Sequence, residues 1–289
     1  MKILKQLLAL IKKLFISPKS DIETRFIPGC ISSPEDKRDF ITTAIIPEDT
    51  DIPSKFFWNI PFIRNQGIYG SCVGFGSAGL KNVQENIQDN LITDGLSPLF
   101  IYTLCKQQDG IPNQEGTYIR LAMQNLLNIG IATEKELPYW LLRGPFEFPY
   151  ISEELKTTAN KYKIKSYASV PLHNLKALKL ALQVSPVVAG FYIYSNFFSL
   201  KNGFVLTPED DIAGGHCVLF DGYDDDMTYT YPNKVTKKGF IRFSNSWGTN
   251  WGDNGYGYIS YDDFYNSDLI FEMWSSVDDF VSPPTPTKY

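Results

Sequence analysis

The chain has 289 residues, 43% of them hydrophobic and 20% charged, a balance typical of a globular protein large enough for one big core or two lobes. Its net charge of -5, without a basic patch in the body, argues against a nucleic-acid-binding protein. The four cysteines, Cys30, Cys72, Cys105 and Cys217, include no CxxC pair, which argues against a zinc or dithiol motif and mildly favours a reducing compartment.

Residues 1–17 are predicted to form a basic amphipathic helix, with lysines mainly on one face and leucine and isoleucine side chains on the other. The segment is far too short to span a bilayer. It either binds a membrane surface or a partner, or it packs on the rest of the protein. No small-x-small cleavage site follows, so no cleavable signal peptide is evident, and an intracellular or virion-associated location is expected rather than secretion.

Residues 18–61 are rich in Pro, Asp, Ser and Glu and are expected to form an extended leader or surface belt, with Cys30 as a free surface thiol or a packed one. Beyond it, helices are expected from Cys72 onward and at 97–106, 117–130, 152–163 and 174–183. Strands are expected at 187–194, 217–220, 239–243 and 256–261. Helices followed by strands predict an α+β protein with two lobes, ahead of a Pro-rich tail at 278–289.

A glycine-rich turn leads from Gln66 into Cys72, where the first of these helical patterns begins. A thiol at a helix N-terminus lies at the positive end of the helix dipole, which favours the thiolate. Backbone N–H groups without helical partners at the same place can hold a developing oxyanion, and Gln66 adds a side-chain amide donor. The pattern predicts an activated nucleophile, which needs a base.

Only two histidines are available as that base. His173 lies near a predicted helix start in a polar setting and is expected to be structural or exposed. His216 follows two glycines at the start of a strand, where another backbone or a substrate can approach it. Asn245 and Trp247 follow in a later segment; a buried Asn can accept from an imidazole N–H and fix its tautomer, and an indole can shield that bond from water.

These three segments, in this order, resemble the papain-like cysteine peptidases over roughly residues 60–275, and in particular their bacterial and viral branch with a short leader. The resemblance implies that Cys72 is the nucleophile, Gln66 the oxyanion-hole glutamine and His216 the base. It also implies that Asn245 orients the histidine and that Trp247 covers the contact between them.

The resemblance further implies a two-lobed fold with a helical lobe at about 66–165, an antiparallel β-barrel-like lobe at about 166–277 and the active-site cleft between them, together forming a peptidase domain at 62–277. Gly116 matches a glycine whose backbone binds the substrate strand, while Glu115 replaces the glycine that usually precedes it. Gly215 and Trp247 are the other candidate substrate contacts. The leader is expected either to lie across the cleft as an inhibitory segment or to join the lobes.

Three departures from the family pattern stand out. Tyr69 replaces one half of a usual disulfide, and Val73 replaces an aromatic residue beside the nucleophile. An extended hairpin is expected in the 28 residues between His216 and Asn245, and it contains Asp224-Asp-Asp226. A solvated charge run is favoured over a calcium site there because the EF-hand spacing is absent.

The predicted activity is hydrolysis of peptide bonds in a peptide or protein substrate, through a Cys-His-Asn triad and a thioester acyl-enzyme, with no metal or cofactor. One alternative keeps the triad but transfers the acyl group to an amine, which would make the protein a transpeptidase or transamidase. The other alternative is a non-catalytic binding protein on the same fold.

Overall fold

The computed structural model describes residues 26–41, 51–88, 90, 92–200, 202–207, 211–266 and 268–278. The amphipathic helix predicted for residues 1–17 and the tail beyond Asp278 lie outside these residues. Within the described ranges, no helix is both long and apolar enough to cross a membrane.

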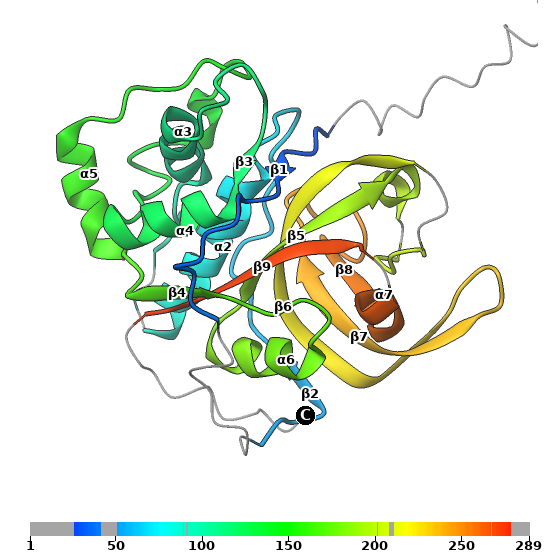
Figure 1. The fold of residues 1–289 in the computed structure, drawn as a ribbon. Coiled ribbons are helices and arrows are strands. Elements are labelled where there is room, and N and C mark those ends of the chain that lie inside the picture. The colour runs from blue at the N-terminus through cyan, green and yellow to red at the C-terminus, as the bar shows by residue number, and fades with distance from the viewer. Residues whose placement is uncertain are drawn as a thin grey trace, which may run out of the picture.

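A helical lobe and a sheet lobe lie side by side, as Figure 1 shows. The helical lobe contains α2 (Cys72–Ile87), α3 (Pro98–Gln108), α4 (Ile119–Asn128) and the short α5 (Glu153–Ala159). Ser97 begins α3 as predicted, because its Oγ accepts the Phe100 N–H at 3.1 Å and Pro98 occupies the first helical position. The helix predicted at 152–163 is shorter, since α5 ends at Ala159 and a 3-10 turn (Asn160–Tyr162) follows.

The second lobe is a seven-stranded sheet in which all the paired strands are antiparallel. Its order is β4 (Ser166–Ser169), β9 (Ile270–Val277), β5 (Val187–Tyr194), β6 (Ile212–Thr230), β7 (Thr236–Ser244) and β8 (Tyr256–Ser260), and β2 (Lys55–Phe57) also pairs with β6. This order is an open path among the described strands, so the β lobe is barrel-like without being a closed ring. The predicted α+β fold with two lobes is confirmed.

The structure corrects several predicted strands. β6 is far longer than the predicted segment 217–220, and its far half pairs with β7 as the expected hairpin up to Thr230 and Thr236. β4 and β9 were not predicted. Two helices complete this lobe: α6 (Leu175–Val184) packs on β5 and β6, and α7 (Tyr261–Asn266) packs on β7 and β8.

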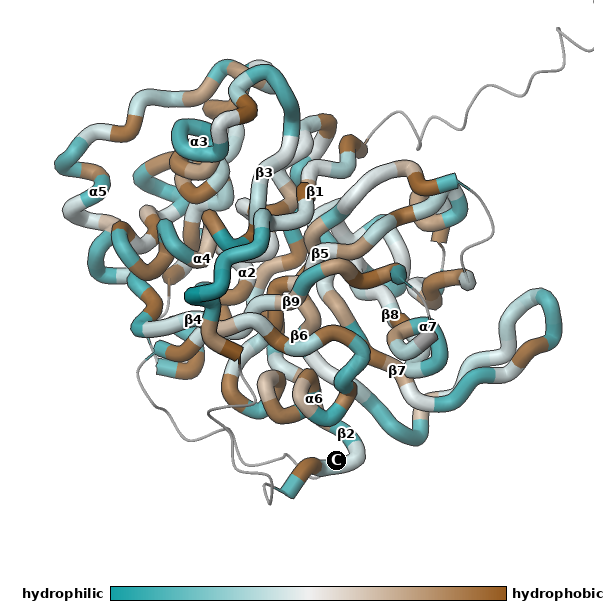
Figure 2. The backbone as a smooth tube through the Cα atoms, in the orientation of Figure 1, coloured by the Kyte–Doolittle hydropathy of each residue, from teal (hydrophilic) through white to brown (hydrophobic). Residues whose placement is uncertain are grey.

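The hydrophobic core continues through both lobes. Figure 2 shows hydrophobic segments gathered in the interior around α2 and β5, while the peripheral loops are largely hydrophilic. α2 packs against β6 through Gly76, where a Cβ would lie 2.8 Å from the Cys217 Sγ. A residue without a side chain therefore brings the helix and the sheet close together.

The described part of the leader follows two separate paths. Residues 51–61 pack into the body: β2 extends the sheet, Trp58 is buried, and its Nε1 donates to the Leu182 carbonyl at 2.8 Å. Residues 26–41 instead pass between the lobes, where β1 (Cys30–Ile31) pairs in parallel with β3 (Thr117–Tyr118), as Figure 1 shows.

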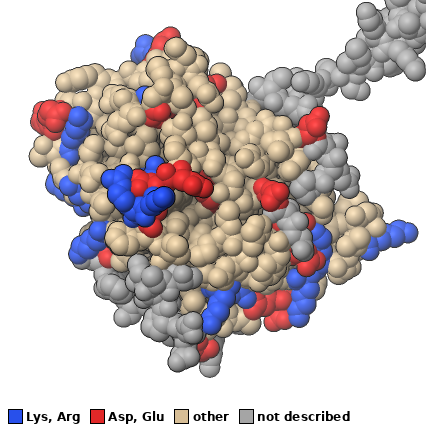
Figure 3. Space-filling model, viewed as in Figure 1, with Lys and Arg blue, Asp and Glu red and all other residues tan. Residues whose placement is uncertain are grey.

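Ion pairs fix the outer part of this passage. Arg120 of α4 contacts Asp36 at 3.2 Å and Asp39 at 3.4 Å, and Arg38 also pairs with Asp36. On the face drawn in Figure 3, acidic and basic side chains lie interspersed, which suits such local pairing.

Candidate active site

Cys72 is the first residue of α2 and is completely buried. The preceding turn is tight, with the Ser71 N–H donating to the Tyr69 carbonyl at 2.9 Å. The Gly70 N–H donates to Oε1 of Glu115 at 3.0 Å. The residue that replaces the usual glycine therefore holds the turn that presents the thiol.

His216 and Asn245 come from neighbouring strands of the sheet. His216 lies within β6, Asn245 follows the end of β7, and His216 Nε2 lies 2.8 Å from Asn245 Oδ1. Because the same Oδ1 accepts the Ser246 N–H at 2.8 Å, it is an acceptor, and the imidazole donates from Nε2. Nδ1 is then the unprotonated nitrogen, and it is buried with no hydrogen-bond partner within the described chain.

Aromatic rings enclose this contact. The Trp247 and His216 ring centroids lie 4.8 Å apart, and Phe198 stacks on Trp247 with centroids 5.3 Å apart and planes at 8°. Phe197 contacts both His216 and Trp247, and its carbonyl accepts from Nε1 of Trp251 at 3.0 Å. Trp247 was predicted from the sequence, whereas Phe197 and Phe198 were not, because a short 3-10 segment has no period that shows which side faces the histidine.

Gln66 connects the two halves of the site. Its Oε1 accepts from the Ser246 hydroxyl at 2.5 Å, and its backbone N–H donates to the Ser246 carbonyl at 2.8 Å. This leaves Nε2 as the donor, at 2.7 Å from the Tyr69 carbonyl and 3.2 Å from the Ile27 carbonyl. The Tyr139 hydroxyl also donates to the Gln66 carbonyl at 2.7 Å.

The leader fills the space between these residues. Phe26 stacks on Trp247 with ring centroids 4.6 Å apart, and the Ile27 carbonyl accepts from Gln66. The Gly29 carbonyl accepts the Thr117 N–H at 3.1 Å. The leader therefore contacts both lobes within four residues.

Three glycines make this close passage possible. Gly29 crosses so near Gly70 that a Cβ on Gly29 would lie 1.9 Å from the Gly70 carbonyl oxygen. Gly116 has a φ of +87°, and its own Cβ would meet the Gly29 carbonyl oxygen at 2.6 Å. On the opposite lobe, a Cβ on Gly215 would lie 2.2 Å from the Cys30 carbonyl oxygen. Gly116, Gly215 and Trp247, the predicted substrate contacts, thus all touch the leader.

Burial favours the uncharged forms of Cys72 and His216 in this covered state. Burial raises the pKa of the Cys72 thiol well above its ordinary value, and the nearby Cys217 adds to the rise. Burial lowers the pKa of His216 to about 4, against a smaller opposing effect of the Asn245 hydrogen bond. Around neutral pH the covered site therefore holds a thiol and a neutral imidazole.

Comparison with known proteins gives this geometry its family. The family model for papain family cysteine proteases matches residues 46–272, most of the chain. The chain belongs to the papain family of cysteine proteases. It is therefore a hydrolase that cleaves peptide bonds, as the sequence analysis predicted.

The relatives of this papain-family protease come from several kingdoms. Zingipain-2 of Zingiber officinale is 26% identical over 71% of this chain and 86% of its own length. An uncharacterized peptidase C1-like protein of Acanthamoeba polyphaga mimivirus is 28% identical over 73% of this chain and 68% of its own. The crystal structure of xylellain, a cysteine protease from Xylella fastidiosa, superposes with a TM-score of 0.76 and 28% identity, over 88% of this chain and 96% of xylellain.

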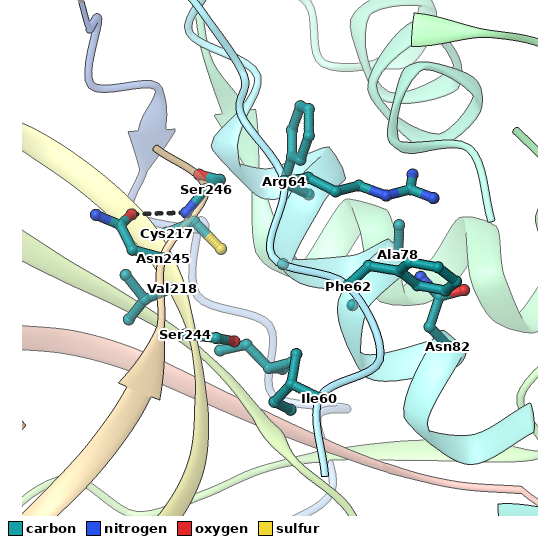
Figure 4. Close-up of a pocket in the computed structure, with 14 residues that line it drawn as sticks. Ile60, Phe62, Arg64, Ala78, Asn82, Cys217, Val218, Ser244, Asn245 and Ser246 are labelled. Atoms are coloured by element: carbon teal, nitrogen blue, oxygen red, sulfur yellow. Dashed lines mark hydrogen bonds between the residues drawn. The ribbon is translucent and has the colours of Figure 1, made fainter. Parts of the chain in front are cut away.

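The papain-family protease also has a small cavity behind the site, between α2 and the β6–β7 pair. Its volume is about 30 Å³, and Ala78, Asn82, Cys217, Asn245 and Ser246 are among the residues that line it (Figure 4). Nδ2 of Asn245 is buried without a hydrogen-bond partner among the described residues. The cavity has the size and the polar lining that a single buried water needs.

The remaining candidates lie away from the cleft. His173 has a φ of +54°, and its Nδ1 lies 3.2 Å from the Phe264 carbonyl on α7, which is a structural position. The three aspartates of the hairpin each pair with a different lysine: Asp224 with Lys55, Asp225 with Lys179 and Asp226 with Lys238. In the described chain, no group of three or more His, Cys, Asp or Glu side chains has an arrangement suited to a metal ion.

Proposed function

We propose that this papain-family protease hydrolyses peptide bonds with Cys72 as the nucleophile, His216 as the base and Asn245 as the residue that orients the base. The observation that carries the proposal is the buried hydrogen bond of 2.8 Å between His216 and Asn245. It commits one imidazole nitrogen to Asn245 and leaves Nδ1 available to exchange a proton with the thiol.

In the proposed reaction, the Cys72 thiol transfers its proton to His216 Nδ1, and the thiolate attacks the peptide carbonyl. The carbonyl oxygen becomes an oxyanion, held by the Gln66 side-chain amide and the Cys72 backbone N–H at the start of α2. His216 then protonates the leaving amine, and a thioester to Cys72 remains. Water, deprotonated by His216, hydrolyses the thioester and regenerates the thiol.

The hydrogen bond between Ser246 and Gln66 supports the oxyanion role of Gln66. By occupying Oε1, the Ser246 hydroxyl turns the amide so that Nε2 faces the cleft. The Ile27 carbonyl accepts from this Nε2 in the covered state, so a substrate carbonyl can take the same position once the leader leaves. Gly116 and Gly215 would then give a substrate backbone the close approach that they give the leader.

We also propose that residues 26–41 act as an inhibitory leader and that the removable part ends before Asp51. The contacts of Phe26, Ile27 and Gly29 with the site support inhibition, because a substrate cannot reach Cys72 past them. The packing of β2 and Trp58 supports the boundary, since these residues contribute to the sheet and the core.

The proposal is tested by labelling the protein, freed of residues 1–50, with an epoxide that alkylates activated thiols. One adduct on Cys72 is expected, lost in Cys72→Ala and in His216→Ala but kept in the matched variants Cys105→Ser and His173→Ala. A Cys72 that stays unmodified would favour a non-catalytic binding protein. An added amine acceptor that appears in a ligated product would favour a transferase over a hydrolase.

A further inference from the structure

The thiol of Cys30 in the leader packs against β5 of the sheet. Cys30 is 5% exposed, and its Sγ lies 3.1 Å from the position that a Cβ on Gly190 would occupy. Gly190 on β5 is the direct register partner of Cys217 on β6. The Cβ positions of two directly paired residues lie about 5 Å apart on the same face of a sheet. The missing side chain of Gly190 therefore opens a space beside Cys217, which the Phe271 ring and the Cys30 thiol share.

The two thiols lie near each other in this space. Burial raises the pKa of Cys30, and the neighbouring Cys217 raises it further. Cys217 is 1% exposed, and a Cβ on Gly76 of α2 would lie 2.8 Å from its Sγ. One free thiol from the leader and one from the body thus lie close together where the leader crosses the sheet.

The backbone around Cys30 is fixed on both sides. β1 pairs with β3 of the helical lobe, and the Cys30 carbonyl oxygen lies against Gly215 of β6, two residues before Cys217. A disulfide needs the Cα atoms about 4.4–6.8 Å apart and Cβ vectors that face each other. The leader backbone packs on β6 at Gly215, and the Cys30 thiol lies against Gly190, the register partner of Cys217, which is the kind of approach that a disulfide needs.

We propose that Cys30 and Cys217 form a disulfide that locks the leader across the cleft. The oxidant is a low-molecular-weight disulfide such as oxidised glutathione. One protein thiolate attacks it and releases one reduced thiol; the second protein thiolate then displaces the other reduced thiol from the mixed disulfide. The protein gives up two electrons and two protons, and both go to the two thiols released. Reductant reverses both steps.

Two other cysteines are possible competitors. Cys72 influences the pKa of Cys30, and Cys217 influences the pKa of Cys72, so Cys72 is the nearer competitor for either thiol. Cys105 lies on α3 within the helical lobe, where Nδ2 of Asn125 contacts its sulfur at 3.6 Å. Because Cys30 lies beside Gly190, the register partner of Cys217, a disulfide between Cys30 and Cys217 is the pairing that the sheet predicts.

The test is disulfide mapping of the full chain at graded ratios of oxidised to reduced glutathione. Trypsin places the four cysteines on separate peptides, 26–37, 65–81, 82–106 and 202–234. We expect the oxidised protein to yield 26–37 joined to 202–234, lighter by two hydrogens than the two peptides together and separated by reductant. Peptide 26–37 joined to 65–81, or found unpaired at every ratio, would overturn the proposal.

The second readout is the rate at which the epoxide labels Cys72, and this part rests on the proposed function. Oxidation should slow the labelling by at least about tenfold, because a tether raises the effective concentration of the leader at the cleft. Reductant should restore the rate. Cys30→Ser should make the rate insensitive to glutathione disulfide, whereas the matched variant Cys105→Ser should keep the full effect.

If oxidation slowed the labelling of Cys72 equally in Cys30→Ser, it would act on Cys72 itself. That result would contradict a disulfide that holds the leader across the cleft. Failure of the proposed function gives a different pattern. In that case Cys72 would stay unlabelled even in reduced protein freed of its leader, while the disulfide map would still report whether Cys30 pairs with Cys217.

Discussion

The carbonyl oxygen of Ile27 accepts a hydrogen bond from Nε2 of Gln66 at 3.2 Å, so a leader carbonyl occupies the donor that the proposed mechanism assigns to the substrate carbonyl. Pro28 and Gly29 follow directly, and Gly29 is close enough to Cys72 to influence the pKa of its thiol. The leader therefore lies against both Gln66 and Cys72.

The stacking of Phe26 on Trp247 should hold the leader in place. Phe26→Ala removes an aromatic pair worth about 0.5–1.5 kcal/mol together with the buried area of the ring. We expect the full chain to turn over a peptide substrate about tenfold faster, as a larger fraction of molecules has an open cleft. Phe40→Ala is the matched control, because Phe40 lies in the same leader with its side chain 74% exposed. Equal rates in the two variants would argue against an inhibitory leader.

The leader boundary can be tested by two truncations. A protein lacking residues 1–50 should become active and lose only the stabilisation that the leader contacts supply. A protein lacking residues 1–61 also loses β2 and the Trp58 side chain, whose removal alone typically costs about 3–5 kcal/mol. Thermal unfolding of the two proteins checks this expectation. Equal midpoints would place the functional boundary further along the chain.

Gln66→Ala should lower kcat by about 10²–10³, the usual effect of removing one oxyanion donor, with a smaller change in KM. The variant should be made in the protein lacking residues 1–50, since Gln66 also holds Ile27 in the full chain. Ser246→Ala removes the hydroxyl that orients the Gln66 amide and should lower kcat by a smaller factor. If Ser246→Ala lowered kcat more than Gln66→Ala, the Gln66 amide would not be the main oxyanion donor.

Falling pH should weaken the leader through His216. In the covered state the pKa of His216 is lowered to about 4, so the uncovered state binds a proton more readily between about pH 6.5 and 4. The covered state consequently loses up to ~3 kcal/mol relative to the open state as pH falls through this range. The ratio of Cys72 labelling rates, full chain over protein lacking residues 1–50, should rise towards one.

Glu272 opposes this effect and supplies the control. Burial raises its pKa and outweighs the hydrogen bonds of Trp274 and of Ser33 in the leader, which lower it, so the covered state favours protonated Glu272 and gains stability as pH falls. Asp36 adds little to this effect, because its pKa is lowered mainly by Arg38 of the same leader segment, and the contact with Arg120 contributes least. With Glu272→Gln, the ratio of Cys72 labelling rates should therefore rise more steeply as the pH falls. A shallower rise would show that another titrating group dominates.

The parts of the site that depend on local pattern were predictable from the sequence. The turn into α2, the strand carrying His216 and the cap at Ser97 each depend on neighbouring residues. β4 and β9 were missed because their burial comes from pairing partners distant in sequence, and β9 interrupts its apolar residues with Glu272 and two serines. The path of the leader depends on close contacts of Gly29 and Cys30 with glycines far along the chain, from Gly70 to Gly215. No local sequence pattern connects these positions.

The crossing of Gly29 over Gly70 has a consequence for how the chain can change during evolution. An alanine at position 29 would bring its Cβ to 1.9 Å from the Gly70 carbonyl oxygen, so this level of the cleft admits only a residue without a side chain. A larger residue at position 29 would push the leader away from Gly70, so the absence of one methyl group sets how deep this segment can lie. Exposed leader positions such as Lys37 and Phe40 carry no comparable steric limit.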